Sequence, residues 1–392
     1  MKREVRKRLP FSFMRRRILT IVLLGLAAAA AVFAETDTVR LASPDGQLEL
    51  RLFVVSPKDA ILVRMAYSVT FRGKLLMDTS LLGIAIRDQE VFLGETVGLV
   101  NAKEESVAAP GNHYNSLIAQ YIQNGSLGRR ITIEARAYDD GVAFRYYIPR
   151  PSTVEDLQIE EELTDFHFAQ DGEAYTAILS GYQSNKGEYS RTKLSVIQRS
   201  SLLALPVLVE QPGVGWVAIT QAQLDNYPGM YVFHPEGNTM RTTLAPRIDD
   251  QAMAMHGMTP AETPWRVLMV ASEPRKFLDS DIVRNLNPAS RITETSWIKQ
   301  PKEWVTLGNL NGLEEQFASL EKKGVGGVKV DLMNRADQEM IGVYRHAAEA
   351  AAAHHLMIEF QNGPMDGIER TWPNVISRED APFRRIVLQA EP

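Results

Sequence analysis

The sequence contains no cysteine among its 392 residues. Disulfide bonds, thiolate catalysis and cysteine-based zinc sites are therefore excluded, although this absence does not identify a cellular compartment. Positive charge is also scarce beyond the N-terminus. The first 34 residues carry eight of the 43 Lys and Arg residues and one of the 48 acidic residues, so the remainder has a formal net charge of −12. Such a surface repels nucleic acid and anionic lipid, and it is compatible with a neutral sugar.

The longest hydrophobic run lies near the N-terminus. Arg15–Arg17 precedes the apolar stretch Ile18–Phe33, and Val32-Phe33-Ala34 follows the small-residue pattern that signal peptidases require. We predict that residues 1–34 are a signal peptide, so that the mature protein begins at Glu35 and is periplasmic or secreted, with no membrane attachment. The alternative is a retained anchor, for which the run is somewhat short because a spanning helix needs about twenty residues.

The region after the signal peptide has mostly β-type patterning. Apolar residues alternate with other residues over Leu48–Val54, and Asp139-Asp140-Gly141 is a hairpin turn signal. Many short strands separated by Gly, Pro and Asn clusters over roughly 250 residues predict a large antiparallel β-sandwich. Because the turn-forming stretch Asn287–Ser290 closes this region, we predict a sandwich domain over residues 35–292 and a second domain over residues 293–392.

The second domain contains a short β-branched run that ends on a carboxylate, Gly327–Met333. Such runs between Gly punctuation and a helix are typical of buried parallel strands. A charged side chain at the C-terminal end of a barrel strand lies where catalysis takes place. Lys329 and Asp331 are two residues apart and share one face of the strand, so the ammonium favours the ionised carboxylate. The residues alone leave two interpretations open, a nucleophile or a structural Lys–Asp pair.

A strand–helix–strand unit is predicted around this run. Asp337 can cap a helix over residues 338–355, whose Met340, Tyr344, Ala347 and Ala351 recur at helical spacing. The next strand is predicted over residues 356–360. His354 and His355 are adjacent and point apart, which makes them poor joint metal ligands.

These segments resemble glycoside hydrolase family 97, the bacterial α-glucosidases and α-galactosidases. The resemblance extends from about Val39 to Asp380. It rests on the following stretches: Ser43–Gly46, Ala137–Arg145, Thr263–Arg266, Ser296–Lys299, Gly327–Met333, Asp337–Met340, Asn362–Pro364, Arg370–Asn374 and Arg378-Glu379. The resemblance implies a multi-domain protein, with an N-terminal antiparallel super-sandwich followed by a TIM-type α/β barrel.

The second domain is too short for a closed barrel. A full eight-stranded barrel needs about 250 residues, whereas residues 293–392 supply only 100. Between Lys302 and Gly327 there is room for less than one βα unit of about 30 residues, although family members have extra units there. The stretch Ala381–Pro392 does not resemble the family. We therefore predict a partial barrel.

The resemblance also implies a set of site residues. Asp331 falls on the nucleophile of the retaining members, and Lys329 falls beside it, placed to bind a sugar hydroxyl. The family's acid/base Glu falls close to Arg385, in the stretch that no longer matches, and Gln361 stands where the family has His. The loss of a general acid costs about 10²–10⁴-fold in rate.

A calcium site is implied in the same way. The family binds calcium beside the sugar through carboxylates from both domains, and Glu379 and Glu188 fall on two of them. A surface loop acid is an equally good interpretation of Glu188. The implied partner is an oligosaccharide or α-glycoside. Two functions remain open: an exported, retaining, exo-acting α-galactosidase or α-glucosidase whose activity is impaired, or a noncatalytic carbohydrate-binding remnant.

Overall fold

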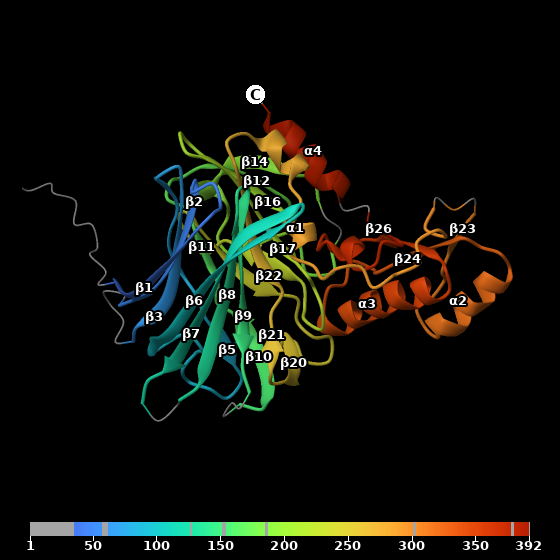
Figure 1. The fold of residues 1–392 in the computed structure, drawn as a ribbon, viewed down its shortest axis with the longest axis horizontal. Helices are drawn as coiled ribbons and strands as arrows, with labels where there is room; N and C mark the ends of the chain where they lie inside the picture. The colour runs from blue at the N-terminus through green and yellow to red at the C-terminus, as the bar shows by residue number, and fades with distance from the viewer. Residues whose placement is uncertain are drawn as a thin grey trace, which may run out of the picture. The chain divides into compact units, whose positions relative to one another are not determined.

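Figure 1 shows the computed structural model of the chain. The structure describes residues 35–56, 62–125, 128–150, 154–184, 187–299, 301, 303–377 and 380–391. These residues belong to one compact unit, Glu35–Pro392, and the predicted signal peptide lies outside them. Among the helices within these ranges, none has the length and apolar character needed to cross a membrane.

Four antiparallel sheets, of four, ten, three and five strands, form the N-terminal region. The four-stranded sheet contains β1 (Glu35–Ala42), β2 (Leu48–Val55), β3 (Arg64–Phe71) and β4 (Lys74–Leu81), in that order. The ten-stranded sheet contains, in spatial order, β14 (Ser190–Lys193), β12 (Glu173–Thr176), β16 (Val207–Gln211), β17 (Gly215–Ala222), β22 (Trp265–Ala271), β9 (Gly141–Ile148), β8 (Arg130–Tyr138), β7 (Asn112–Gln123) and β6 (Val97–Ala109), with β21 (Ala261–Glu262) paired to β9. The three-stranded sheet contains β20 (Met255–Met258), β10 (Asp156–Glu162) and β5 (Ile84–Ile86). The five-stranded sheet contains β11 (Asp165–His167), β19 (Thr239–Leu244), β18 (Met230–Phe233), β15 (Leu202–Leu203) and β13 (Ile178–Leu179).

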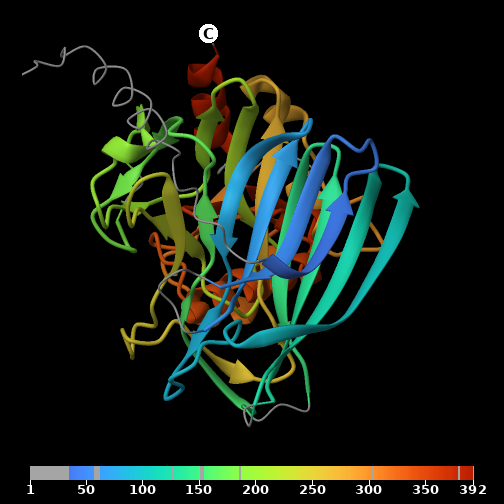
Figure 2. The same cartoon turned by 90° about the vertical axis from the view of Figure 1, so that its left-hand side faces the viewer.

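The sandwich core lies between the four-stranded and the ten-stranded sheets, as Figures 1 and 2 show for the blue strands β1–β3 and the teal strands β6–β8. The alternation predicted for Leu48–Val54 places Leu48, Leu50 and Leu52 in this core, where each is almost completely buried. The predicted turn at Asp139-Asp140 connects β8 to β9, which pair from Tyr138 and Gly141 onward. The prediction of an antiparallel sandwich is therefore confirmed.

The C-terminal region contains a four-stranded parallel sheet and no closed barrel within the described residues. Its strands, in spatial order, are β23 (Trp304–Thr306), β24 (Gly327–Asp331), β25 (Met357–Gln361) and β26 (Val375–Ser377). The helices within the described residues are η1 (Leu194–Val196), η2 (Pro274–Asp279), α1 (Ile282–Asn285), α2 (Leu313–Lys322), α3 (Gln338–Ala353), η3 (Ile368–Arg370) and α4 (Asp380–Ala390). The prediction of a partial barrel is confirmed.

Helix α3 begins where the sequence predicts, because the Asp337 side chain accepts a hydrogen bond from the Met340 backbone N–H. The helix ends at Ala353, two residues before the predicted end, and β25 begins one residue later than predicted. The predicted apolar stripe is buried against Val328, Val330 and Ile358 of the parallel sheet.

Helix α4 packs against the sandwich rather than against the parallel sheet. Its apolar positions Phe383, Ile386, Val387 and Ala390 are buried in one cluster with Phe277 of η2 and Ile282 of α1. Figure 1 shows α4 in red at the end of the chain, beside the sandwich strands. Sequence analysis assigned no structure to this stretch.

Candidate functional site

The C-terminal end of β24 presents Asp331 on the surface of the described structure. One carboxylate oxygen, Oδ1, accepts two hydrogen bonds. The Met333 backbone N–H donates at 2.8 Å and the Asn362 side-chain amide donates at 3.0 Å. The first bond closes an Asx-type turn, and the second comes from the residue directly after the neighbouring parallel strand, β25. The carboxyl ends of two adjacent strands therefore hold one carboxylate oxygen.

Lys329 does not form the predicted pair with Asp331. Its ammonium lies 3.7 Å from the Glu359 carboxylate and 5.7 Å from the centre of the Trp304 ring. Lys329 and Glu359 are partners in the register of β24 and β25, so their side chains stand on the same face. Glu359 on the neighbouring strand is therefore closer to Lys329 than Asp331 is, and the Glu359 side chain is almost fully buried. The structural Lys–Asp interpretation is therefore wrong.

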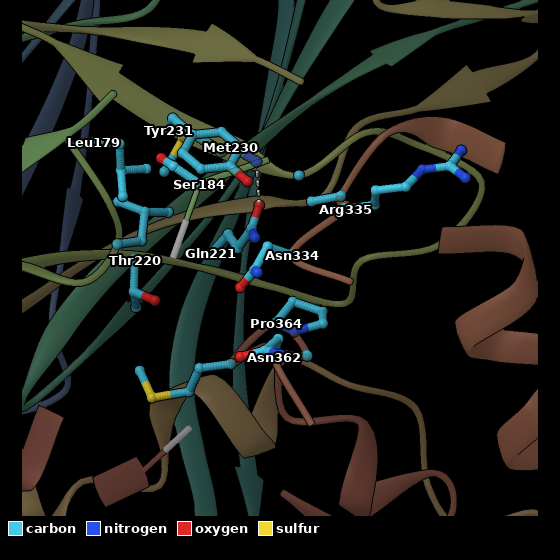
Figure 3. Close-up of a pocket in the computed structure, with 15 residues that line it drawn as sticks. Leu179, Ser184, Thr220, Gln221, Met230, Tyr231, Asn334, Arg335, Asn362 and Pro364 are labelled. Carbon is cyan, nitrogen blue, oxygen red and sulfur yellow. Dashed lines mark hydrogen bonds between the residues drawn. The ribbon is translucent and has the colours of Figure 1, made fainter. Parts of the chain in front are cut away.

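A cavity of about 330 Å³ lies beside the Asp331 end of the sheet. On one side it is lined by the sandwich, and on the other by the segments that follow β24 and β25. Figure 3 shows Thr220, Gln221 and Tyr231 facing Asn334 and Asn362 across this space. The described lining residues include no Asp or Glu: they are Leu179, Ser184, Leu205, Thr220, Gln221, Gly229, Met230, Tyr231, Asn334, Arg335, Ala336, Asn362, Gly363, Pro364 and Met365.

Two polar side chains of the sandwich at the cavity, Gln221 and Thr220, differ in whether they have a hydrogen-bond partner. The Gln221 side-chain oxygen accepts a hydrogen bond from the Met230 backbone N–H at 2.9 Å. The Thr220 hydroxyl is buried and has no hydrogen-bond partner among the described residues. An unsatisfied buried hydroxyl is costly, so a polar ligand atom that reached Thr220 would be favoured.

The loop after β24 is fixed to the sandwich by its backbone. The Gly229 N–H donates to the Ala336 carbonyl at 2.7 Å. A Cβ atom added at Gly229 would lie 2.7 Å from the Ala336 Cβ, so this close approach requires glycine. In the same loop, hydrogen bonds to Asp337 raise the pKa of the Arg335 guanidinium. The Arg335 guanidinium is therefore held by Asp337, and Figure 3 shows its side chain extending away from the other lining residues.

A buried carboxylate joins the loop after β25 to the sandwich and to α3. Asp366 accepts hydrogen bonds from the Tyr344 hydroxyl at 2.9 Å and from the Leu224 backbone N–H at 3.0 Å, and the Arg345 guanidinium lies 3.4 Å away. Burial raises the pKa of Asp366, and the nearby Arg345 charge and the hydrogen bonds offset only part of this effect. The group is saturated by protein partners, which points to a structural role.

The remaining predicted site residues are not brought together. Glu188 is exposed on a loop, and Glu379 lies outside the described residues. Within the described ranges no group of three or more His, Asp or Glu residues could hold a metal ion. The calcium site implied by Glu188 and Glu379 therefore stays a prediction, because Glu379 is not among the described residues. Arg385 is exposed on α4, and Gln361 is half-buried at the end of β25.

Three polar residues of this region escaped sequence analysis as site residues: Glu359, Asn362 and Asp366. Asn362 lay within a turn motif and Glu359 within a predicted strand. Only the parallel pairing of β25 with β24 shows that Glu359 and Asn362 lie beside polar residues of β24. Nothing in the sequence indicates that these positions are close in space.

Comparison with known proteins agrees with the resemblance. The family profile described as Glycosyl-hydrolase 97 N-terminal matches residues 41–288, and the one described as Glycoside hydrolase 97 matches residues 297–381. A protein of Bacteroides thetaiotaomicron named "Retaining alpha-galactosidase" is 23% identical over 479 positions, which cover 92% of this chain and 70% of that protein. This alignment is longer than the chain, so the relative contains internal segments that have no counterpart here.

Further relatives give the same picture. A "Probable retaining alpha-galactosidase" of Streptomyces bingchenggensis is 23% identical, covering 92% of this chain and 68% of that protein. Among solved structures, a glycoside hydrolase family 97 enzyme from Pseudoalteromonas sp. strain K8 in complex with acarbose is similar with a TM-score of 0.76 at 18% identity, covering 86% of this chain and 68% of that one. These structures support the fold.

Proposed function

Because this chain belongs to glycoside hydrolase family 97, we propose that it is an exported, retaining, exo-acting glycosidase for α-galactosides or α-glucosides, with impaired turnover. The observation that carries the proposal is the position of Asp331. Its carboxylate stands exposed at the C-terminal end of a parallel strand, with one oxygen held by two donors, and one of these donors, Asn362, lines a cavity. Two relatives are named retaining alpha-galactosidases, and a solved neighbour holds acarbose.

In the proposed reaction Asp331 is the nucleophile. Its carboxylate attacks the anomeric carbon, the bond to the leaving group breaks, and a glycosyl ester forms that water then hydrolyses. Lys329, steadied by Glu359, is proposed to bind a hydroxyl of the sugar. Retention also requires a second carboxyl about 5–5.5 Å from the nucleophile to protonate the leaving group. The family's acid position falls near Arg385, which α4 carries on an exposed face.

This arrangement favours substrates whose leaving group needs no proton. Loss of the general acid slows an ordinary glycoside by about 10²–10⁴-fold, but fluoride departs as a stable anion. The full chain is therefore assayed with α-galactosyl fluoride and α-glucosyl fluoride, and fluoride release is followed. We expect release to depend on Asp331, with Asp331→Ala abolishing it and azide partly restoring it as a glycosyl azide.

The control is Glu349→Gln, an exposed carboxylate on α3 outside the cavity, which should release fluoride at the wild-type rate. Equal rates in the wild type and in Asp331→Ala would remove Asp331 from the mechanism.

One observation favours the second candidate, a noncatalytic carbohydrate-binding protein. The described cavity lining offers amide, hydroxyl and tyrosine groups that suit sugar hydroxyls, but no carboxyl. Isothermal titration with acarbose and with a galactoside distinguishes the two functions. Binding without fluoride release would favour this candidate.

Calcium binding through Glu188 and Glu379 is proposed on the family relationship alone, and no catalytic step is derived through it. Titration of the chain with CaCl₂ tests it, with Glu188→Gln as the comparison. Heat of binding that is unchanged in the variant would remove Glu188 from the site.

Export is proposed from the basic, apolar and small residues of the first 34 positions. N-terminal sequencing of the expressed protein should find Glu35 as the first residue. An intact leader in the membrane fraction would contradict the proposal.

A further inference from the structure

We propose that Asn362 is a positioning residue, which fixes the Asp331 carboxylate so that Oδ2 is the attacking oxygen. The inference rests on the proposed nucleophilic role of Asp331. It assigns a role to a residue that neither strand pattern nor charge singles out.

The hydrogen bonds of Asp331 are unevenly distributed between its two oxygens. The Met333 N–H and the Asn362 amide both donate to Oδ1, at 2.8 and 3.0 Å. Within the part of the chain that the structure describes, Oδ2 receives no donor. Two donors that arrive from different strand ends fix both the rotation and the tilt of the carboxylate, which one donor cannot do. Oδ2 is thereby the oxygen with an uncommitted lone pair.

The backbone on both sides of the contact between Asp331 and Asn362 is in the left-handed region. Asn362 has φ +57°, and Met333 and Asn334 have φ +53° and +54°. Non-glycine residues rarely adopt this left-handed region, and for Met333 it carries a cost without the local hydrogen bonding that helps asparagine. Left-handed residues at the ends of two adjacent strands turn one N–H and one side-chain amide toward the same oxygen. Such concentrated backbone strain is found most often at functional sites.

Asn362 also lines the 330 Å³ cavity, so the same side chain contacts both the carboxylate and the space where a sugar would lie. When Oδ2 attacks the anomeric carbon, an Oδ2–carbon bond forms while the bond to the leaving group breaks and its electron pair departs with the leaving group. The Asp331 carboxylate becomes a neutral ester. By holding Oδ1, the Asn362 amide keeps Oδ2 aligned with the anomeric carbon. Misplacement of Oδ2 by about 1 Å would lower the rate by up to about 10²-fold.

A simpler interpretation of Asn362 is a turn former after β25, since asparagine tolerates left-handed backbone better than most residues. Two variants separate the interpretations. Asn362→Gly keeps the left-handed backbone without strain and removes only the amide. Asn362→Asp keeps the shape and replaces the donor with an acceptor beside Asp331. Asn226→Gly is the matched control, because Asn226 also has a left-handed backbone, φ +46°, and lies outside the cavity lining.

The first measurement needs no substrate. A water-soluble carbodiimide with an amine couples to accessible carboxyl groups, and peptide mass spectrometry reports the rate of modification of Asp331 at one fixed pH in the full chain. We expect Asp331 to be modified several-fold faster in Asn362→Gly and in Asn362→Asp, because the carboxylate loses the donor that holds Oδ1. The rate in Asn226→Gly should match the wild type. Identical rates in all four proteins would overturn the positioning role.

The second measurement uses a 5-fluoro-α-glycosyl fluoride, in the galactose and glucose forms, which traps the glycosyl ester on the nucleophile while fluoride leaves. We expect labelling of Asp331 in the wild type, and a maximal labelling rate about 10- to 100-fold lower in both Asn362 variants at a similar half-saturating concentration. Equal labelling rates would overturn the inference. Absence of wild-type label, combined with faster carbodiimide modification of Asp331 in the Asn362 variants, would support the positioning role and count against the proposed function alone.

Discussion

The sandwich and the parallel sheet bury their apolar faces by different means. The sandwich packs its four-stranded and ten-stranded sheets on each other, so both inner faces are covered by its own strands. The parallel sheet covers one face with its own helices α2 and α3, through residues such as Val328 and Ile358. Its opposite face carries Lys329 and Glu359 as a pair. A sandwich is complete as a unit, whereas four barrel strands leave one face without the strands that would close around it.

The contrast explains why the C-terminal region depends on the sandwich. Asp366, the loop at Ala336 and helix α4 each bond or pack against sandwich residues. In a closed barrel the neighbouring strands would hold these loops. Here the sandwich holds the ends of β24 and β25 in place, and with them Asp331 and Asn362. We therefore expect damage in the sandwich to spread to the site, and damage in the parallel sheet to remain more local.

The largest effect is expected from Glu162→Gln in the sandwich core. Glu162 and Arg266 form an ion pair with both side chains fully buried, and the substitution leaves the Arg266 charge without its partner. We expect a loss of about 3–5 kcal/mol in the free energy of unfolding. Urea denaturation measures it, and hydrogen exchange of the peptides around β24 shows whether the parallel sheet loses protection together with the sandwich.

The control for this prediction is Glu236→Gln, which breaks an exposed ion pair with Arg199 and should change stability little. We would abandon the dependence of the parallel sheet on the sandwich if β24 stayed protected from hydrogen exchange in Glu162→Gln at a urea concentration where the sandwich has unfolded.

The second effect concerns helix α4. Ile386 is fully buried against the sandwich, whereas Leu388 on the same helix is 48% exposed. We expect Ile386→Ala to cost about 2–5 kcal/mol and Leu388→Ala less than about 0.5 kcal/mol. Thermal unfolding of the two variants compares them directly. Equal midpoints would mean that α4 does not pack where the structure places it.

The sequence predicted the fold better than the site. Alternation at Leu48–Val54 and the turn at Asp139-Asp140 specify strands and a hairpin, because the pattern and the contact are local. The short second domain predicted an incomplete barrel by length alone. Lys329 was paired with the wrong carboxylate because its partner, Glu359, is thirty residues away and is brought near only by the parallel register. Asn362 was missed for the same reason, whereas helix α4 was missed because its apolar positions pack against η2 and α1, far earlier in the chain.

The third effect is a dependence of stability on pH that comes from Asp366, which joins the loop after β25 to the sandwich and to α3. Burial raises its pKa above the usual 3.8. A carboxyl with a raised folded pKa contributes stability below the unfolded value and loses it as pH rises through the folded value. Asp366→Asn does not titrate, so its stability relative to the wild type should increase as pH rises from about 3.8 through the raised pKa. Urea midpoints of both proteins measured across this range test the sign, and a constant difference would contradict it.

The smallest effect on stability is expected from Glu321, on the exposed surface of α2. Hydrogen bonding to His354 lowers the pKa of Glu321 from its usual 4.5, and His355 adds to the effect. A lowered acid pKa contributes stability above the unfolded value, and this contribution is lost as pH falls through the folded value. Because the Glu321 side chain is exposed to solvent, its contribution is small and is screened by salt. We expect Glu321→Gln to lower the thermal midpoint slightly at pH 7 in low salt, and not at pH 3. A difference that persists at pH 3, or that 0.5 M NaCl leaves unchanged, would show that the ion pair is not what joins α2 to α3.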